Sequence, residues 1–424
     1  MTLSIQTDRN LIRAAATSTR YVLARIAAPR AREREDRLPP PVNVGIVLDR
    51  SGSMRDERKF GLASEAVEQS LRMLRSEDRF ALVVYDTEID VLMPSTLATS
   101  ETKRRALNAL REIGPRGGTD LCAGWMRGCE EVAQFLERDR VSRCLLLTDG
   151  LANHGTTDRD ELTGHAGELR RRGVSTSAFG VGADFDERLL RDMAHEGGGN
   201  FYFIEGASQI PAMLTSELGE TLEVTLRNAS LIVTLPPGAT AETLNRFRQA
   251  RLADRNELRV DVGDLVSAQE LEIVLKLTFP QGELGQQMSI ECELASSGES
   301  IQETVCRLEW TYATHGDNDV QPRDREVDRA VAELYAARAR AEATEANRNG
   351  RYEQARQVLE ATARRIREYA GDDQALLRLA SVLRDDVPQY AEAPMAAMAL
   401  KRSLYASEAA SKGRDSLGRA RRKP

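Results

Sequence analysis

The chain lacks any long apolar run. No stretch of its 424 residues approaches the roughly 18–20 apolar residues that a membrane-spanning helix needs. Residues 1–30 carry scattered arginines and no sustained apolar core, which argues against a signal peptide. We therefore expect a cytoplasmic protein that has no membrane partner.

Cysteine is scarce, and its five copies form no metal-ligand spacing. An odd number argues against a disulfide framework. Cys122 and Cys129 lie on one predicted helix and indicate a buried stripe, whereas Cys292 and Cys306 lie in two predicted strands and could face each other. We expect free thiols in a reducing compartment.

An excess of basic residues is also absent. The formal net charge of −7 argues against a nucleic-acid partner, because such binding needs a basic surface. Hydrophobic residues make up 41% and charged residues 29% of the chain, as in soluble globular proteins. The length exceeds what one ordinary core accommodates, so we expect two or three domains.

Residues 40–220 alternate strand-like apolar runs with amphipathic helical runs. The predicted strands are Val42–Leu48, Phe80–Tyr85, Cys144–Leu147, Ser175–Val181 and Phe201–Ile204. Between them, apolar residues recur at helical spacing, for example at Phe60, Ala63, Val67 and Leu71. This alternation predicts an α/β domain with a doubly wound, Rossmann-like, mostly parallel sheet.

The flanks predict a β-sandwich into which the α/β domain is inserted. Residues 222–314 are rich in strand patterns and turn signals. Residues 1–38 contain two strand candidates, Thr2–Gln6 and Tyr21–Ala27, which are too few to stand alone. We therefore assign residues 1–38 and 222–314 to one sandwich, with the arginine-rich and proline-rich stretch at 30–41 as the linker.

The C-terminal part predicts helices. Residues 321–410 carry apolar stripes at helical spacing, and Gly350, Tyr352 and Ala355 between two helices resemble the helix–turn–helix of a tetratricopeptide repeat. One such hairpin is predicted, not an array. Residues 411–424 are basic and are expected to be disordered.

Polar residues follow the predicted strands at three places. Asp49, Ser51 and Ser53 come directly after the first strand, Thr119 follows a glycine pair, and Asp149 follows a third strand. Ligands of such sheets bind where the strands end. Two carboxylates and three hydroxyls form an all-oxygen set that suits a hard divalent cation with bound waters, so we predict Mg²⁺, with Mn²⁺ or Ca²⁺ as alternatives.

The pattern Asp-x-Ser-Gly-Ser, then Thr, then Thr-Asp-Gly resembles the metal-ion-dependent adhesion site of von Willebrand factor A domains of the bacterial type. All five positions of that motif match, and the resemblance extends over residues 40–220. It implies that the hydroxyls of Ser51, Ser53 and Thr119 contact the metal, and that Asp49 and Asp149 lie close by, often acting through water.

The function that follows is metal-dependent protein–protein interaction, in which a Glu or Asp side chain of a partner protein completes the metal's ligand shell. The chain would then be a scaffold and not an enzyme. Two alternatives stay open. The helical region could be the main partner-binding surface, with a structural or regulatory α/β domain. A metal-assisted hydrolase is the weaker alternative, since no nucleophile or general base stands out.

Overall fold

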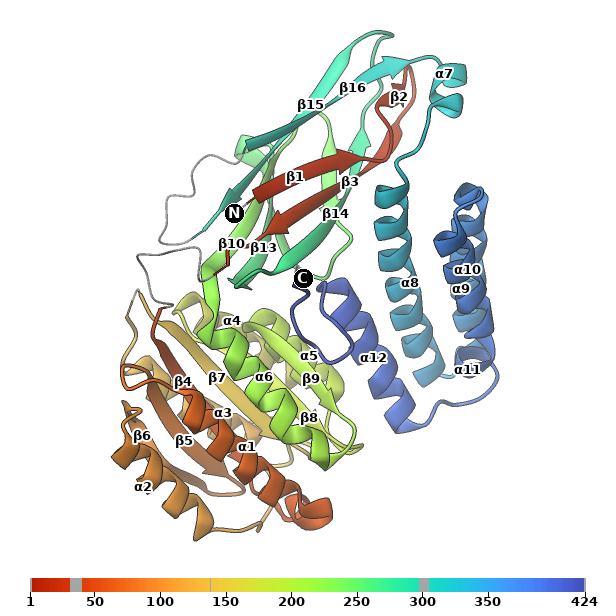
Figure 1. Cartoon of the computed structure of the whole chain (residues 1–424). Coiled ribbons are helices and arrows are strands. Elements are labelled where there is room, and N and C mark those ends of the chain that lie inside the picture. Colours follow the sequence, from red (N-terminus) through yellow and green to blue (C-terminus); the bar gives the residue numbers. More distant parts are fainter. Residues whose placement is uncertain (1, 31–39, 138, 297–304, 423–424) are drawn as a thin grey trace. The chain divides into compact units, whose positions relative to one another are not determined.

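The computed structural model describes residues 2–30, 40–137, 139–296 and 305–422. Residues 31–39 of the predicted linker lie outside this part of the chain. The described residues divide into two compact units (Figure 1). We call residues 40–225 with 417–419 the α/β unit, and residues 2–30 with 226–416 and 420–422 the flanking unit.

The α/β unit is built on a sheet of six strands in the order β6-β5-β4-β7-β8-β9. These are β4 (Val42–Asp49), β5 (Arg79–Tyr85), β6 (Ile89–Leu97), β7 (Val141–Thr148), β8 (Ser175–Val181) and β9 (Gly198–Ile204). All neighbouring pairs are parallel except β5 and β6. The antiparallel edge strand β6, which the sequence analysis did not predict, makes the sheet mixed.

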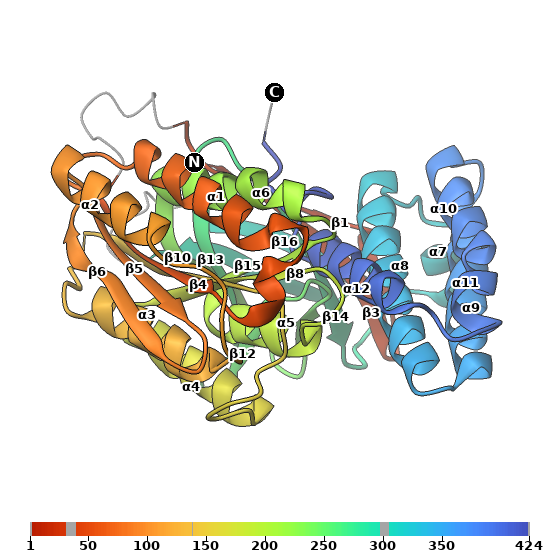
Figure 2. The same cartoon turned by 90° about the horizontal axis from the view of Figure 1, so that it is seen from below.

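Helices cover both faces of this sheet. They are α1 (Lys59–Met73), α2 (Ser100–Arg111), α3 (Leu121–Ala133), α4 (Arg159–Arg171), α5 (Glu187–Glu196) and α6 (Ile210–Leu222). Figures 1 and 2 show α1 and α6 on one face, with α3, α4 and α5 on the other. A short 3₁₀ segment, Gly52–Arg58, precedes α1. This is the doubly wound, Rossmann-like arrangement that the sequence predicts.

Helix α3 lies unusually close to the sheet because two of its residues are glycines. A Cβ atom at Gly128 would stand 2.2 Å from Cγ2 of Val47, and one at Gly124 would stand 2.3 Å from the ring of Tyr85. No side chain fits at such distances. The helix therefore packs with its backbone directly against β4 and β5.

The flanking unit contains two sheets, with strand orders β1-β3-β14-β11 and β12-β13-β10-β15-β16-β2. The strands are β1 (Thr2–Thr7), β2 (Leu11–Arg13), β3 (Ser18–Ala27), β10 (Val224–Thr234), β11 (Thr240–Thr243), β12 (Arg248–Leu252), β13 (Glu257–Val266), β14 (Glu270–Phe279), β15 (Gln287–Ala295) and β16 (Val305–Ala313). Buried side chains from both sheets form one core. Strand β3 pairs with β14, and β2 pairs with β16. Each sheet therefore contains strands that precede the α/β unit in the sequence and strands that follow it.

Helices follow these strands in the order α7 (His315–Val320), α8 (Arg325–Arg348), α9 (Tyr352–Ala370), α10 (Gln374–Asp385), α11 (Val387–Ala391) and α12 (Ala397–Ser411). Helices α8 and α9 are joined at Gly350, whose φ of +70° suits glycine. Figure 1 shows α9 and α10 beside α8. None of the helices in the described residues is both long and apolar enough to cross a membrane.

In the described part of the C-terminal segment, Gln269 pairs with Arg422 and Arg414 pairs with Ala420 through isolated β-bridges. The five cysteines are free thiols, and Cys292 lies directly opposite Cys306 on the neighbouring strand.

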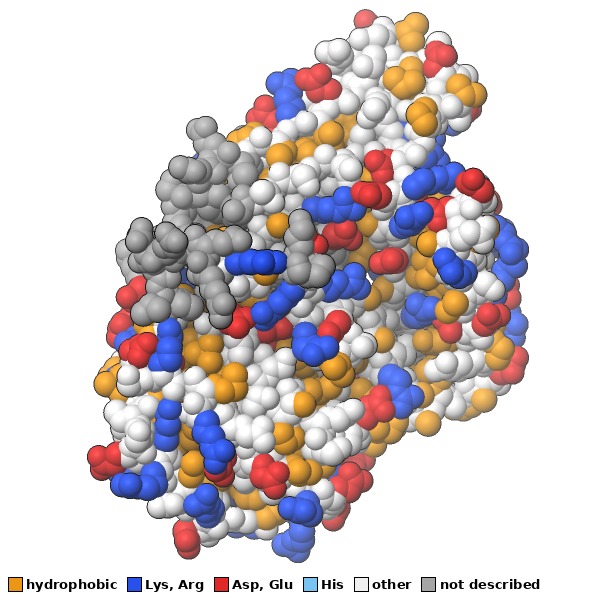
Figure 3. Space-filling view, in the orientation of Figure 1, with side chains coloured by type: hydrophobic (Ala, Val, Ile, Leu, Met, Phe, Trp, Pro, Cys, Tyr) orange, Lys and Arg blue, Asp and Glu red, His pale blue; other side chains and the backbone are white. Residues whose placement is uncertain are grey.

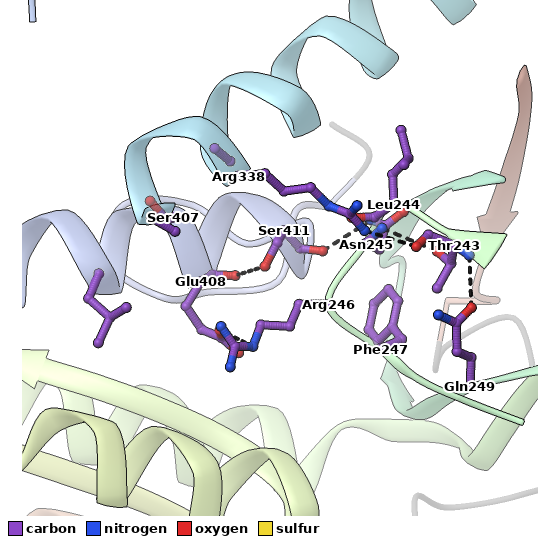
Figure 4. A pocket seen from close by; sticks show the side chains of 13 residues that line it. Thr243, Leu244, Asn245, Arg246, Phe247, Gln249, Arg338, Ser407, Glu408 and Ser411 are labelled. Atoms are coloured by element: carbon purple, nitrogen blue, oxygen red, sulfur yellow. Dashed lines mark hydrogen bonds and ion pairs between the residues drawn. The ribbon is translucent and has the colours of Figure 1, made fainter. Parts of the chain in front are cut away.

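Asn245 joins the end of α12 to the strand region of the flanking unit (Figure 4). Its side-chain amide donates to the carbonyl oxygens of Glu272 (3.0 Å) and Ser411 (3.1 Å), and its Oδ1 accepts from the backbone N–H of Val274 (2.8 Å). Arg338 of α8 donates to the carbonyl oxygen of Leu244, the residue before it. These contacts line one wall of a cavity of about 280 Å³.

Replacing Asn245 by alanine is expected to destabilise the protein by about 2–4 kcal/mol, because it leaves the buried N–H of Val274 without its acceptor and takes an amide donor from the carbonyl oxygens of Glu272 and Ser411. Denaturant unfolding measures the change. Asn108→Ala, at an exposed position of α2, is the control, and it should change the free energy of unfolding by less than about 1 kcal/mol. Equal effects of the two substitutions would contradict the assignment.

Candidate functional site

The site is positioned by the pairing of the two central strands of the α/β unit. Strand β4 pairs in parallel with β7, with Leu48 opposite Leu147. Asp49 ends β4, and Asp149 follows β7 directly. Because parallel strands end at the same edge of a sheet, the two carboxylates lie side by side at the carboxyl edge.

Asp49 is fully buried and held by two hydrogen bonds. Its Oδ1 accepts from the backbone N–H of Ser51 (2.7 Å), and its Oδ2 accepts from the hydroxyl of Thr148 (2.6 Å). Burial raises the pKa of Asp49 to about 6, although the bonds from Ser51 and Thr148 oppose the rise. The carboxylate is therefore fixed in orientation and poorly solvated.

The two serines connect the first motif to Asp149. The hydroxyls of Ser51 and Ser53 lie 3.2 Å apart, and the Ser53 hydroxyl donates to Oδ1 of Asp149 (2.6 Å). Oδ2 of Asp149 accepts from the ammonium of Lys59 at 2.8 Å. Lys59 is only 9% exposed, so this ion pair is shielded from water.

Thr119 is brought to the same place by a loop tied to the first motif. The backbone N–H of Gly52 donates to the carbonyl oxygen of Gly117 (3.1 Å), and that of Thr119 donates to Oδ1 of Asn153 (2.9 Å). A Cβ atom at Gly150 would lie 3.5 Å from the Thr119 hydroxyl and 3.8 Å from that of Ser53. The two hydroxyls therefore flank one small space beside Gly150.

All five predicted site residues thus meet at one edge of the sheet. Within the described residues, the Thr119 hydroxyl makes no hydrogen bond to the other four, so it is adjacent to their network without being part of it.

A buried ion pair supports the loops below the site. Arg50 is 3% exposed, and its Nε lies 2.8 Å from Oδ2 of Asp86, which also accepts from Arg116 (2.8 Å). Burial alone would raise the pKa of Asp86, but the hydrogen bond from Arg116 and the charge of Arg50 hold it below its ordinary value. The carbonyl oxygen of Asp86 accepts from Asp120, which connects this pair to the Thr119 loop.

The donors at the site are all oxygen atoms, and this fits a hard divalent cation. The part of the chain that the structure describes contains no group of three or more His, Cys, Asp or Glu placed to hold a metal. A cation at this edge would therefore depend on the hydroxyls of Ser51, Ser53 and Thr119 as well as on the two carboxylates.

The sequence prediction missed three residues that shape the site, namely Thr148, Lys59 and Arg50. Lys59 had a detectable signal. It lies four residues before Ala63 and therefore on the apolar face of α1, where a lysine is unexpected. Arg50 follows a strand that is buried throughout. From the sequence alone, however, a charged residue directly after a strand is equally compatible with a solvent-exposed position. Thr148 was visible only as part of the Thr-Asp-Gly motif.

Comparisons with known proteins bear on the α/β unit and its fold. Residues 43–215 match the family model of the von Willebrand factor type A domain. "Uncharacterized protein YfbK" of Escherichia coli is 25% identical over 293 residues, which are 66% of this chain and 50% of that protein. This chain thus corresponds to about half the length of that relative. "Uncharacterized protein sll0103" of Synechocystis is 28% identical over 69% of this chain and 70% of its own.

A solved structure shares the fold over nearly the whole chain. The von Willebrand factor type A protein of Catenulispora acidiphila superposes with a TM-score of 0.73 over 96% of both chains, at 16% identity. At this identity the likeness concerns the fold alone. Together with the family match and the strand-end arrangement of the α/β unit, it leads to one conclusion. Residues 43–215 of this chain form a von Willebrand factor type A domain.

Proposed function

We propose that the α/β unit is a metal-dependent interaction module that captures a Glu or Asp side chain of a partner protein. Domains of this family commonly mediate protein–protein interactions. When bound, a divalent cation would supply a positive centre that attracts a carboxylate. Ser51, Ser53 and Thr119 would hold it, with Asp49 and Asp149 beside them, and Mg²⁺ is the expected ion.

The observation that carries this proposal is the continuous hydrogen-bond chain from Ser51 through Ser53 to Asp149. This chain brings the neutral hydroxyls of Ser51 and Ser53 next to the carboxylate of Asp149. The Thr119 hydroxyl lies beside the Ser53 hydroxyl, near Gly150. Hydroxyl ligands withdraw little charge from a cation, so a cation held mainly by them would keep its attraction for an added anion.

The charge of Lys59 favours an acidic partner. Lys59 pairs with Asp149, so the site carries one net negative charge instead of two. A divalent cation would turn this into one net positive charge, and a carboxylate from a partner would bring it to neutrality. Lys59 thus weakens the attraction for the cation alone and strengthens the attraction of the cation-loaded site for a carboxylate.

The competing proposal, a metal-assisted hydrolase, has less support. Asp49 accepts hydrogen bonds at both carboxylate oxygens, and Asp149 is held by Ser53 and Lys59. Neither carboxylate is thereby left free to serve as a general base. We therefore favour binding over catalysis.

The first test is direct metal binding. Calorimetric titration of the full chain with Mn²⁺, as a stand-in for Mg²⁺, should show one saturable site that EDTA abolishes. The double substitution Ser51→Ala with Ser53→Ala should weaken binding about tenfold or more, because it removes two of the proposed ligands. Ser76→Ala, at an exposed serine of the same unit, is the control and should bind like the wild type. A wild-type chain without a metal site would refute the proposed function.

The second test concerns Lys59. In the wild type, acetate should raise the affinity for Mn²⁺, and by linkage Mn²⁺ should raise the affinity for acetate. Lys59→Met should increase Mn²⁺ affinity in the absence of acetate by about tenfold, since a unit charge next to the site is removed. The same substitution should diminish the effect of acetate. Calorimetry with and without acetate measures both.

Two further variants complete the test of Lys59. Lys59→Arg keeps the charge and should retain the acetate effect. Lys103→Met, at the lysine whose ammonium donates to the carbonyl oxygen of Leu74, removes a lysine elsewhere in the unit and should leave both affinities unchanged. An identical acetate effect in the wild type and in Lys59→Met would contradict the role given to this charge.

A further inference from the structure

The flanking unit contains a cavity of about 510 Å³ that no part of the proposed metal-dependent function uses. Residues of β3 and of the helices α8 and α9 line it. Tyr21 of β3, Tyr335 of α8 and Tyr369 of α9 form part of its wall. Its volume lies within the range of about 300–1,000 Å³ that is typical of small-molecule sites.

The floor of the cavity is apolar. Val331 of α8 and Ile366 of α9 both line it, and both are buried. The rings of Tyr21 and Tyr335 meet edge to face, with centroids 6.2 Å apart. A ligand that enters this space therefore meets aliphatic and aromatic surface, which favours a planar apolar body.

Charges at the rim are predominantly positive, with four arginines against Asp8 and Glu368. The guanidinium of Arg323 is neutralised by two hydrogen bonds to Asp328 (2.5 and 2.8 Å), and Arg9 lies 3.5 Å from Asp8. These two arginines are therefore largely compensated.

The other two arginines of the rim, Arg364 and Arg365 of α9, are exposed. Neither forms a hydrogen bond or an ion pair with another residue in the described ranges. Figure 3 shows acidic and basic side chains interspersed over the visible face, so overall charge does not single out this place. What distinguishes this place is that two guanidinium groups without an ion-pair partner lie beside an apolar cavity.

A hydroxyl proton is also available at the wall. The hydroxyl oxygens of Tyr21 and Tyr335 lie 3.0 Å apart. The two hydroxyls have two protons, but only one of them lies between the oxygens. The second proton can be donated to a ligand. Arg365, Tyr21 and Tyr369 line the same cavity. Burial raises the pKa of both tyrosines, and the charge of Arg365 opposes the rise at both.

We propose that this cavity binds an organic anion with a planar apolar body. Its acidic group is held by Arg365 and by the free hydroxyl proton of the Tyr21–Tyr335 pair. Its body lies on Val331 and Ile366, beside the ring of Tyr369. A phosphate or carboxylate on an aromatic ring has this chemistry, and it comes either from a free small molecule or from a peptide side chain such as phosphotyrosine.

Calorimetric titration of the full chain with phenyl phosphate tests the proposal. We expect one saturable site with a dissociation constant of about 1 mM or tighter, as befits a ligand of this size. Phenol lacks the charge and inorganic phosphate lacks the ring, so each should bind at least about tenfold more weakly. Absence of saturable binding, or equal affinity for inorganic phosphate and phenyl phosphate, would overturn the proposal.

Variants locate the binding. Arg365→Gln should weaken phenyl phosphate binding about fivefold, a modest loss because the arginine is exposed. The double substitution Tyr21→Phe with Tyr335→Phe should weaken it about threefold or more, because it removes both hydroxyl protons, whereas either single substitution leaves one hydroxyl proton that the ligand can still accept. Arg367→Gln is the matched control, since Arg367 is an exposed arginine of the same helix that does not line the cavity. Equal losses in Arg365→Gln and Arg367→Gln would show non-specific attraction and refute the site.

A third titration identifies the source of the anion. A short peptide with phosphotyrosine between alanines should also bind at the cavity and be sensitive to Arg365→Gln. Tighter binding of the peptide than of phenyl phosphate would assign a protein as the source, and weaker binding would assign a free small molecule. Insensitivity of the peptide to Arg365→Gln would contradict recognition of the anion at this cavity. Because no metal is involved, these outcomes are independent of the Mn²⁺ titrations.

Discussion

The parallel pairing of β4 with β7 is the constraint on which the site depends. It places Asp49 and Asp149 at neighbouring strand ends, although a hundred residues separate them in the sequence. The rest of the site is arranged around these two buried carboxylates. Their burial is tolerable only because each is met by donors, namely Thr148 and the Ser51 amide for the first, and Ser53 and Lys59 for the second.

The buried ion pair of Arg50 and Asp86 supports the loops that carry the site residues. The carbonyl oxygen of Arg50 accepts from the backbone N–H of Arg116, and that of Asp86 accepts from the backbone N–H of Asp120, so the pair connects the loop after β4 to the loop that carries Thr119. A buried ion pair contributes little net stability, but losing one partner leaves an unpaired buried charge. We infer that the pair fixes the position of the two loops relative to each other. This matters more for a site assembled from three segments than for a site on one segment.

Much of the α/β unit could be predicted from sequence. Short apolar runs such as Val44–Leu48 and residues 144–147, each bounded by polar residues, have the length of buried strands and mark the central strands. Strand β6 escaped because Asp90 and Pro94 interrupt its apolar pattern, and only its antiparallel pairing with β5 makes it a strand. The motif positions were predictable because each follows a strand. The partner contacts were not, because that of Thr148 with Asp49 depends on the pairing of β7 with β4, and that of Lys59 with Asp149 depends on how helix α1 packs against the sheet.

The glycines of α3 have a consequence for the site. Because Gly124 and Gly128 let the helix backbone touch β4 and β5, the distance between helix and sheet is set by atoms that cannot be compressed, and not by adaptable side chains. Thr119 stands two residues before the first turn of this helix. The close packing of α3 on β4 and β5 therefore also fixes where the loop before α3 begins its course along the sheet edge. This constrains the position of the Thr119 backbone relative to the ends of the two strands.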